Sequence, residues 1–183
     1  MKQVDNDIIE RCKAGDREAF RTVVQECRSM VYSLSLKMLC NEDDALDALQ
    51  DTFLKVWQNI ASYDGRCSFS TWVYGIASHL CIDRMRRVRF ISPMPGDEDT
   101  LRECLSDDNP QRRLEAGEWV RIVRLLADRL SEKQRIVFTL CQLEGLEAAE
   151  VEEITGMSAD RIKRNLYAAR QTIRERLKKM GYE

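Results

Sequence analysis

Apolar residues along most of this chain recur at spacings of three and four, the period of a helix with one buried face. This pattern runs from Asp5 to about Arg89 and resumes from about Arg112 almost to the end. Turn signals interrupt the second stretch near Ser131, Gly145 and Gly156. The chain has no sustained alternation of apolar and polar residues, the pattern that would predict a strand. The pattern therefore predicts an all-α protein.

The segment ISPMPGDEDTLRECLSDDNPQ separates the two helical stretches and carries all three prolines and many acidic residues. Such a composition favours a tether over a packed element. We therefore expect two small helical domains, at residues 5–89 and 112–180, joined by a flexible acidic linker at residues 90–111.

The end of the chain has the pattern of a helix-turn-helix. Val151 and Ile154 give a short apolar face, Gly156 suits the turn, and Ser158 can cap the next helix. The apolar face of that helix consists of Ile162, Leu166, Ala169, Ile173 and Leu177. Other residues of this helix lie off the apolar face and, with Ser158, are candidates for contact with duplex DNA. They are Arg161, Lys163, Arg164, Tyr167 and Arg170.

Such a helix can place its first side chains in the DNA major groove, where guanidinium groups reach guanine edges and phosphates. Arg161 and Arg164 are the expected readers. Two alternatives stay open for this helix. Its basic residues could form only a solvated surface, and Tyr167 could pack against the neighbouring helix instead of contacting phosphate.

Upstream, Ser131 and Gln134 match a capping box that opens the stretch SEKQRIVFTLCQLEG. The apolar stripe of that helix consists of Ile136, Val137, Leu140 and Leu143, and an earlier stripe of Trp119, Ile122, Val123 and Leu126. With the helix-turn-helix, these stripes predict a DNA-binding domain of four helices.

The stretch NEDDALDALQDTFLKVWQNI predicts a helix with two different faces. Its apolar face consists of Leu46, Leu49, Phe53, Val56 or Trp57, and Ile60. Asp47, Gln50 and Asp51 lie largely outside this face. An apolar stripe with an acidic and amide edge suits docking to a partner, and a solvated acidic surface is the alternative.

The next helix is predicted in GRCSFSTWVYGIASHLCIDRMRRVR. Its residues at core spacing are Phe69, Trp72, Val73, Ile76 and Leu80, and its basic end carries Arg84, Arg86, Arg87 and Arg89. Aromatic and cationic side chains together can bind single-stranded DNA by stacking and phosphate attraction. We expect Phe69 and Trp72 to be core residues and the basic end to contact DNA.

The acidic and amide helix, the FSTW and IDRMRR segments, the LSEKQRIVF helix and the terminal helix-turn-helix follow one another in the order found in extracytoplasmic-function sigma factors. The chain resembles that family over nearly its whole length. The resemblance implies that residues 5–89 correspond to sigma region two and residues 112–180 to region four. It implies a transcription initiation factor that binds core RNA polymerase and directs promoter recognition and opening, in response to an extracytoplasmic or stress signal.

The resemblance also implies roles for single residues. Asp47, Gln50 and Asp51 would face the basic clamp helices of the largest polymerase subunit, which charge complementarity favours. Region two would capture an unpaired base of the minus-ten element, and region four would bind the minus-thirty-five element as duplex. The minus-ten contacts would come from Ser68, Ser70, Trp72, His79, Arg84, Arg86 and Arg87. His79 stands where many relatives carry Asn, which leaves the base preference open.

Composition changes this picture only by exclusion. With 44% hydrophobic and 33% charged residues, the chain can fold as a soluble globular protein, and without an apolar run or signal-peptide core we expect it in the cytoplasm. The seven cysteines are irregularly spaced, so we expect free thiols, mostly buried. His79 near Cys81 lacks further ligands for a metal. Nothing resembles a phosphate-binding loop or a nucleophile elbow, so we expect no enzyme activity, cofactor or small-molecule substrate.

Two other interpretations remain at this stage. One is a DNA-binding repressor or activator whose N-terminal half senses a ligand or forms a dimer. The other is a sigma-like protein that has lost promoter activity and binds only a regulator. The family resemblance further implies an anti-sigma factor as a partner. It leaves open whether that partner is associated with a membrane.

Overall fold

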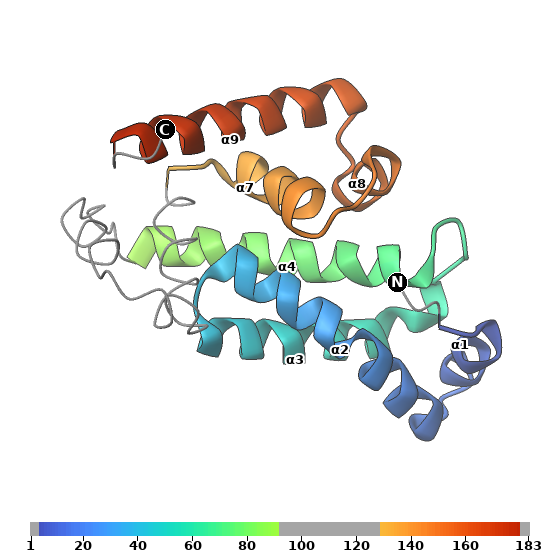
Figure 1. Ribbon diagram of the computed structural model, residues 1–183. Helices are drawn as coiled ribbons and strands as arrows, with labels where there is room; N and C mark the ends of the chain where they lie inside the picture. Colours follow the sequence, from blue (N-terminus) through green and yellow to red (C-terminus); the bar gives the residue numbers. More distant parts are fainter. Residues whose placement is uncertain (1–3, 92–128, 180–183) are drawn as a thin grey trace, which may run out of the picture.

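The computed structural model describes residues 4–91 and 129–179, except for the side chains of residues 88–91. All regular structure within these ranges is helical (Figure 1), which confirms the all-α fold class. We call residues 4–91 the N-terminal half and residues 129–179 the C-terminal half. Most of the predicted linker at residues 90–111, and the predicted stripe from Trp119 to Leu126, lie outside the described residues.

The N-terminal half consists of α1 (Asn6–Lys13), α2 (Arg17–Leu39), α3 (Glu42–Asn59), the short 3₁₀ helix η1 (Ile60–Ser62) and α4 (Phe69–Ile91). Helices α2, α3 and α4 pack against one another, and α1 packs against the first turns of α2 (Figure 1). Their shared core includes Val31, Leu34, Val56 and Val73, all fully buried. Burial of these apolar side chains holds the three long helices together.

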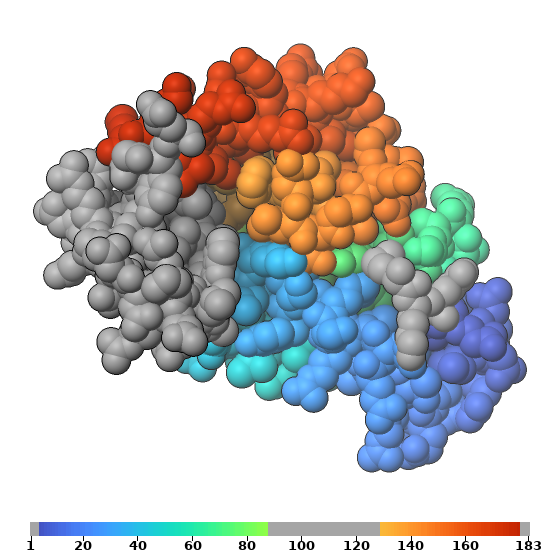
Figure 2. Space-filling view, viewed as in Figure 1, coloured from blue at the N-terminus to red at the C-terminus, as the bar shows by residue number. Residues whose placement is uncertain are grey.

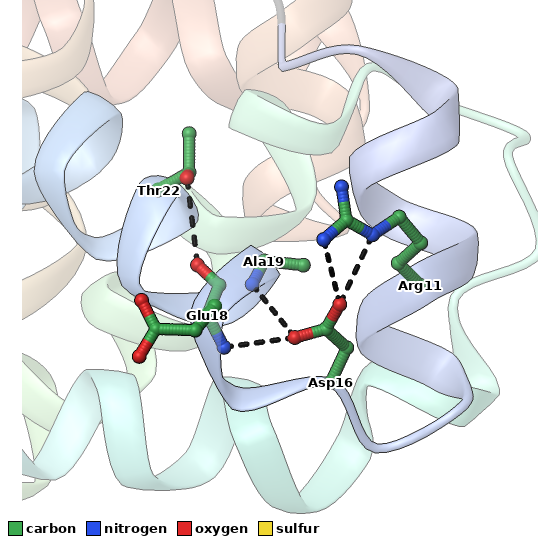
Figure 3. Close-up of polar contacts among 5 residues, drawn as sticks. All are labelled: Arg11, Asp16, Glu18, Ala19 and Thr22. Carbon is green, nitrogen blue, oxygen red and sulfur yellow. Dashed lines mark hydrogen bonds and ion pairs between the residues drawn. The ribbon is translucent and has the colours of Figure 1, made fainter.

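The corner between α1 and α2 shows how local chemistry begins a helix (Figure 3). The Asp16 carboxylate accepts hydrogen bonds from the backbone N–H groups of Glu18 at 2.9 Å and Ala19 at 3.1 Å. Its other oxygen accepts from Arg11 of α1, with Nη2 at 2.7 Å. The N–H of Ala19 and the Arg11 guanidinium both stabilise the charged form, which lowers the pKa of Asp16. Asp16 therefore caps α2 and ties it to α1.

The C-terminal half consists of α7 (Glu132–Phe138), a π-helical continuation η3 (Thr139–Leu143), α8 (Ala148–Thr155) and α9 (Ala159–Lys179). The predicted capping box is confirmed, because Ser131 and Gln134 exchange side-chain to backbone hydrogen bonds. The predicted turn is confirmed as well, since Gly156 ends α8 in the left-handed conformation with φ +64°. The first helix of the expected four-helix domain lies outside the described residues.

The two halves pack directly against each other. In Figure 1, α7 and α8 lie between α9 and α4, and α4 contacts both α7 and α8. The space-filling view shows the C-terminal half seated on the N-terminal half (Figure 2). Buried residues of both halves form one core, to which the C-terminal half contributes Val137, Leu140, Val151 and Ile154.

Three details of the predicted apolar faces are corrected. Leu46 is 40% exposed and Leu143 is 37% exposed, so neither belongs to the core. In α4, Ile76 and Leu80 are only half-buried, whereas Tyr74, Ala77 and Cys81 are buried. The buried face of α4 is rotated because this helix packs against α2 and α3 on one side and α8 on another.

Five cysteines within the described ranges are free thiols, namely Cys12, Cys27, Cys67, Cys81 and Cys141. Cys40 is buried, and Cys104 lies outside these ranges. Burial raises the pKa of Cys27 and of Cys81 to about 11. In the folded protein at pH 8, alkylation should therefore reach the half-buried Cys67 and Cys141 well before Cys27 and Cys81. Peptide mass spectrometry after timed alkylation measures the order. Fast labelling of Cys27 or Cys81 without denaturant would contradict the burial of these two side chains.

None of the described helices is long and apolar enough to cross a membrane. Within the same residues, no three His, Cys, Asp or Glu side chains are grouped in a way that suits a metal ion.

Candidate nucleic-acid interface

The outward surface of α3 combines acidic and apolar side chains. Asp47 and Gln50 are exposed and Asp51 is half-exposed, as the sequence predicted. Leu46 and Leu54 lie one turn on either side of Gln50 and are 40% and 60% exposed. We call these five residues, which share one side of the helix, the α3 surface.

An apolar groove of about 790 Å³ runs beside the α3 surface, between α2 and α3. Phe20 of α2 and Trp57 of α3 lie in its wall, with ring centroids 4.8 Å apart. Leu46, Gln50 and Leu54 line the same groove. This groove was not predicted from the sequence. The spacing of four places Leu46, Gln50 and Leu54 on one side of α3, and the packing of α2 against α3 forms the groove.

Arg84 of α4 lies against the acidic edge of the α3 surface. Its guanidinium is 2.6 Å from the Asp51 carboxylate, 3.5 Å from that of Asp47 and 3.9 Å from that of Asp44. Partial burial alone would lower the pKa of Arg84, but the hydrogen bond and charge of Asp51 outweigh burial and raise it. In this arrangement Arg84 is paired with acidic side chains of α3 and is not a free cation. This differs from the expectation that Arg84 contacts the minus-ten element.

The loop before α4 and the first turn of this helix form an aromatic cluster. Phe69 is 2% exposed and packs in the core, which confirms its expected structural role. Trp72 is half-buried, with its ring centroid 5.4 Å from that of Tyr63. Ser68 is exposed, and its hydroxyl accepts a hydrogen bond from the backbone N–H of Thr71. Ser70 is only 5% exposed, so this structure does not present it to DNA as expected.

Three further candidates for the minus-ten element follow along α4. His79 is exposed, and its Nδ1 donates to the carbonyl of Gly75 at 2.7 Å, which leaves Nε2 directed away from that bond. Arg87 is exposed. Arg86 is exposed too, but its Nε donates to Glu132 of α7 at 2.8 Å. His79 and Arg87 are therefore available to a nucleic acid, and Arg86 would have to leave Glu132.

Helix α9 presents a basic face in its first three turns. Arg161, Lys163 and Arg164 are exposed, while Ile162 and Ala169 are buried, as the pattern predicted. Ser158 stands before the first residue of α9 and is exposed, and its carbonyl accepts from the N–H of Ile162 at 3.0 Å.

Tyr167 and Arg170 extend this face along α9. Tyr167 is 67% exposed, which excludes the alternative that it packs inside the C-terminal half. The exposed Arg170 donates to the Gln142 side chain of η3 at 2.8 Å, so this arginine also links α9 to η3.

Comparison with known proteins identifies the family of the chain. The family model for Sigma-70 region 2 matches residues 23–91, and the model for Sigma-70, region 4 matches residues 121–173. A relative from Bacillus subtilis (strain 168), the ECF RNA polymerase sigma factor SigW, is 28% identical over 97% of this chain and 99% of its own length. The chain belongs to the extracytoplasmic-function group of sigma-70 factors.

Other relatives of this sigma factor carry the same designation. The ECF RNA polymerase sigma-E factor of Escherichia coli (strain K12) is 26% identical, with 92% of both chains covered. Among solved structures, CnrH in complex with the cytosolic domain of CnrY shares the fold, with a TM-score of 0.71 and 19% identity over 96% of this chain and 97% of CnrH. Sigma factors are initiation factors and not enzymes, so the family confirms both of these expectations.

Proposed function

We propose that this sigma factor docks on core RNA polymerase through the α3 surface and contacts a promoter through α4 and α9. The two functional domains would be residues 5–89 and 112–180, with residues 90–111 as the linker. The observation that carries the proposal is the α3 surface itself, where Asp47, Gln50 and Asp51 lie beside exposed leucines and an apolar groove.

The α3 surface suits a helical partner with basic and apolar side chains. The carboxylates of Asp47 and Asp51 would attract cations on the clamp helices of the largest polymerase subunit and fix the orientation of docking. Leu46 and Leu54 would lose contact with water in the complex, which supplies the apolar part of the binding free energy. A solvated acidic surface would not require exposed leucines on the same side of the helix.

The DNA contacts divide between the two halves. Trp72, His79 and Arg87, with Ser68 in the preceding loop, would bind the opened minus-ten element, where stacking and phosphate attraction act on unpaired bases. Arg161, Lys163, Arg164, Tyr167 and Arg170 would meet the minus-thirty-five element as duplex. Capture of unpaired bases by region two would offset part of the cost of opening the duplex.

We assign Arg84 to the docking surface as a positioning residue. Arg84→Ala should weaken core binding about fivefold, because Asp51 loses the guanidinium that holds its carboxylate. Arg84→Lys should recover only part of the affinity, since lysine lacks the planar fork. In an Asp51→Asn background the effect of Arg84→Ala should shrink, which titrations of labelled core enzyme measure as a double-mutant cycle.

The alternative role of Arg84 gives a different result. If this arginine binds the minus-ten element, Arg84→Ala leaves core affinity unchanged and lowers the affinity of the assembled holoenzyme for promoter DNA. Such a result would return Arg84 to the DNA-binding set.

An anti-sigma factor is a further proposed partner, and the cytoplasm is the proposed location because core polymerase and promoter DNA are found there. Support comes from solved relatives, among them the sigma factor RpoE of Bartonella quintana in complex with the anti-sigma factor NepR, with a TM-score of 0.63 and 20% identity over 87% of this chain and 96% of RpoE.

Run-off transcription with purified core enzyme tests the proposed function. We expect the protein to copurify with core polymerase and to produce discrete transcripts from its own promoters. DNA binding without polymerase association would instead identify a repressor or activator. Polymerase binding without transcripts from any genomic fragment would identify a sigma-like protein that has lost promoter activity.

A further inference from the structure

A buried carboxylate joins the two halves of the molecule. Glu144 follows η3 in the C-terminal half, and its side chain is only 9% exposed. Its oxygens accept hydrogen bonds from Ser33 Oγ at 3.0 Å, Lys37 Nζ at 2.7 Å and Tyr74 OH at 2.9 Å. All three donors belong to α2 and α4 of the N-terminal half. Because a buried carboxylate is costly without partners, this set of donors fits Glu144 specifically.

The groups around Glu144 reinforce the same contact. Lys37 also donates to the carbonyl of Leu143 at 3.0 Å, so one ammonium binds both the side chain and the backbone of this turn. Burial, followed by the charge of Glu144 and its hydrogen bond, raises the pKa of Tyr74 above its ordinary value. The Tyr74 hydroxyl therefore stays protonated and remains a donor to Glu144.

Two more polar contacts cross the same interface. Arg86 of α4 pairs with Glu132 of α7 at 2.8 Å, and Arg135 of α7 donates to the Cys40 sulfur at 3.3 Å. Arg135 is only 8% exposed. We call this packing of the two halves against each other the closed arrangement. The shared apolar core and these polar contacts make it a specific interface.

The closed arrangement is too small for the proposed promoter contacts. The minus-ten and minus-thirty-five elements are separated by roughly 25 base pairs, which is about 85 Å of duplex DNA. A compact chain of 183 residues has a diameter of only about 40 Å. The two halves must therefore separate before α4 and α9 can occupy both elements at once.

We propose that Glu144, held by Ser33, Lys37 and Tyr74, is a latch that keeps the free sigma factor closed and that has to open for promoter recognition. The proposal rests on the proposed function for its inhibitory effect, while the latch itself depends only on the contacts between the halves. Only the open fraction can occupy both promoter elements at once, so the closed state reduces the apparent affinity of the protein for promoter DNA.

Two single substitutions, one in each half, and a charge swap test the latch. Glu144→Ala removes the acceptor in the C-terminal half. Lys37→Glu, in the N-terminal half, replaces the cation beside Glu144 with a second carboxylate. Both should raise the radius of gyration of the free protein in small-angle X-ray scattering, and the swap Lys37→Glu with Glu144→Lys should lower it again. Glu175→Ala, which changes an exposed glutamate of α9, is the matched control and should leave it unchanged. Circular dichroism and melting identify the variants that stay folded.

Titration of labelled promoter DNA that carries both elements, with holoenzyme assembled from core enzyme and each variant, tests the inhibition. Holoenzyme with the folded open variants should bind this DNA about tenfold more tightly than holoenzyme with the wild type, and the control should bind equally. A wild type that is already extended, or open-type variants as compact as the wild type, would overturn the latch. Opening without tighter binding would overturn its inhibitory role. If no form binds core enzyme, the proposed function fails, while scattering still decides whether Glu144 holds the halves together.

Discussion

Reversing the charge of Asp47 and Asp51 to lysine should weaken binding to core RNA polymerase by about a hundredfold, because two attractive contacts become repulsive. Both carboxylates are accessible on the α3 surface, with side chains 65% and 47% exposed. Neither belongs to the core of α3, so helicity should be retained. The measurement is titration of labelled core enzyme at several salt concentrations, since screening should narrow the difference.

A control with the same change in net charge separates docking from long-range attraction. Glu153→Lys with Glu175→Lys alters two exposed glutamates of α8 and α9, in the other half of the molecule from the α3 surface. This control should lose little affinity. Because Arg84 would then face two lysines, the neutral pair Asp47→Asn and Asp51→Asn should accompany the reversal and show a smaller loss. Unchanged affinity in the reversed protein at moderate salt would remove both residues from the docking surface.

Local signals were sufficient for the helices and their ends. The capping box at Ser131 and the left-handed turn at Gly156 depend on hydrogen bonds and backbone preferences within a few residues, which the sequence displays directly. The exposure of Arg161 and Arg164 follows from helical period in the same way. Such features need no knowledge of which elements meet.

Features that depend on packing between distant elements could not be predicted. Leu46 fits the apolar period of α3 but borders an open groove, because no described helix covers that side. Arg84 has the sequence context of a DNA-binding cation, and only the packing of α4 on α3 places it beside Asp51. Glu144 would be expected in solvent, and donors from α2 and α4 make its burial possible.

Two surfaces with different chemistry therefore share one small molecule, and their separation follows from the order of the helices. The acidic and apolar α3 surface belongs to the N-terminal half, while α9, the helix with the basic face, lies on the far side of α7 and α8 (Figure 1). Docking can consequently be changed without touching α9. Substitutions on α9 should then alter promoter binding and leave core affinity intact.

Arg164→Ala should cost roughly 1–3 kcal/mol of binding to the preferred minus-thirty-five sequence and relax the preference at one base position. Arg164 is exposed in the second turn of α9, off the face buried through Ile162 and Ala169, so its guanidinium can reach a guanine edge. If Arg164 touches only phosphate, the substitution should weaken binding to every DNA sequence alike.

Lys178→Ala, near the end of α9, is the comparison. If that lysine contacts phosphate, its removal should reduce the salt slope of binding by about one unit without changing base preference. Binding of promoter variants by the holoenzyme across a salt series distinguishes these cases. An Arg164→Ala protein with normal helicity, affinity, base preference and salt slope would show that α9 does not enter the major groove at this residue.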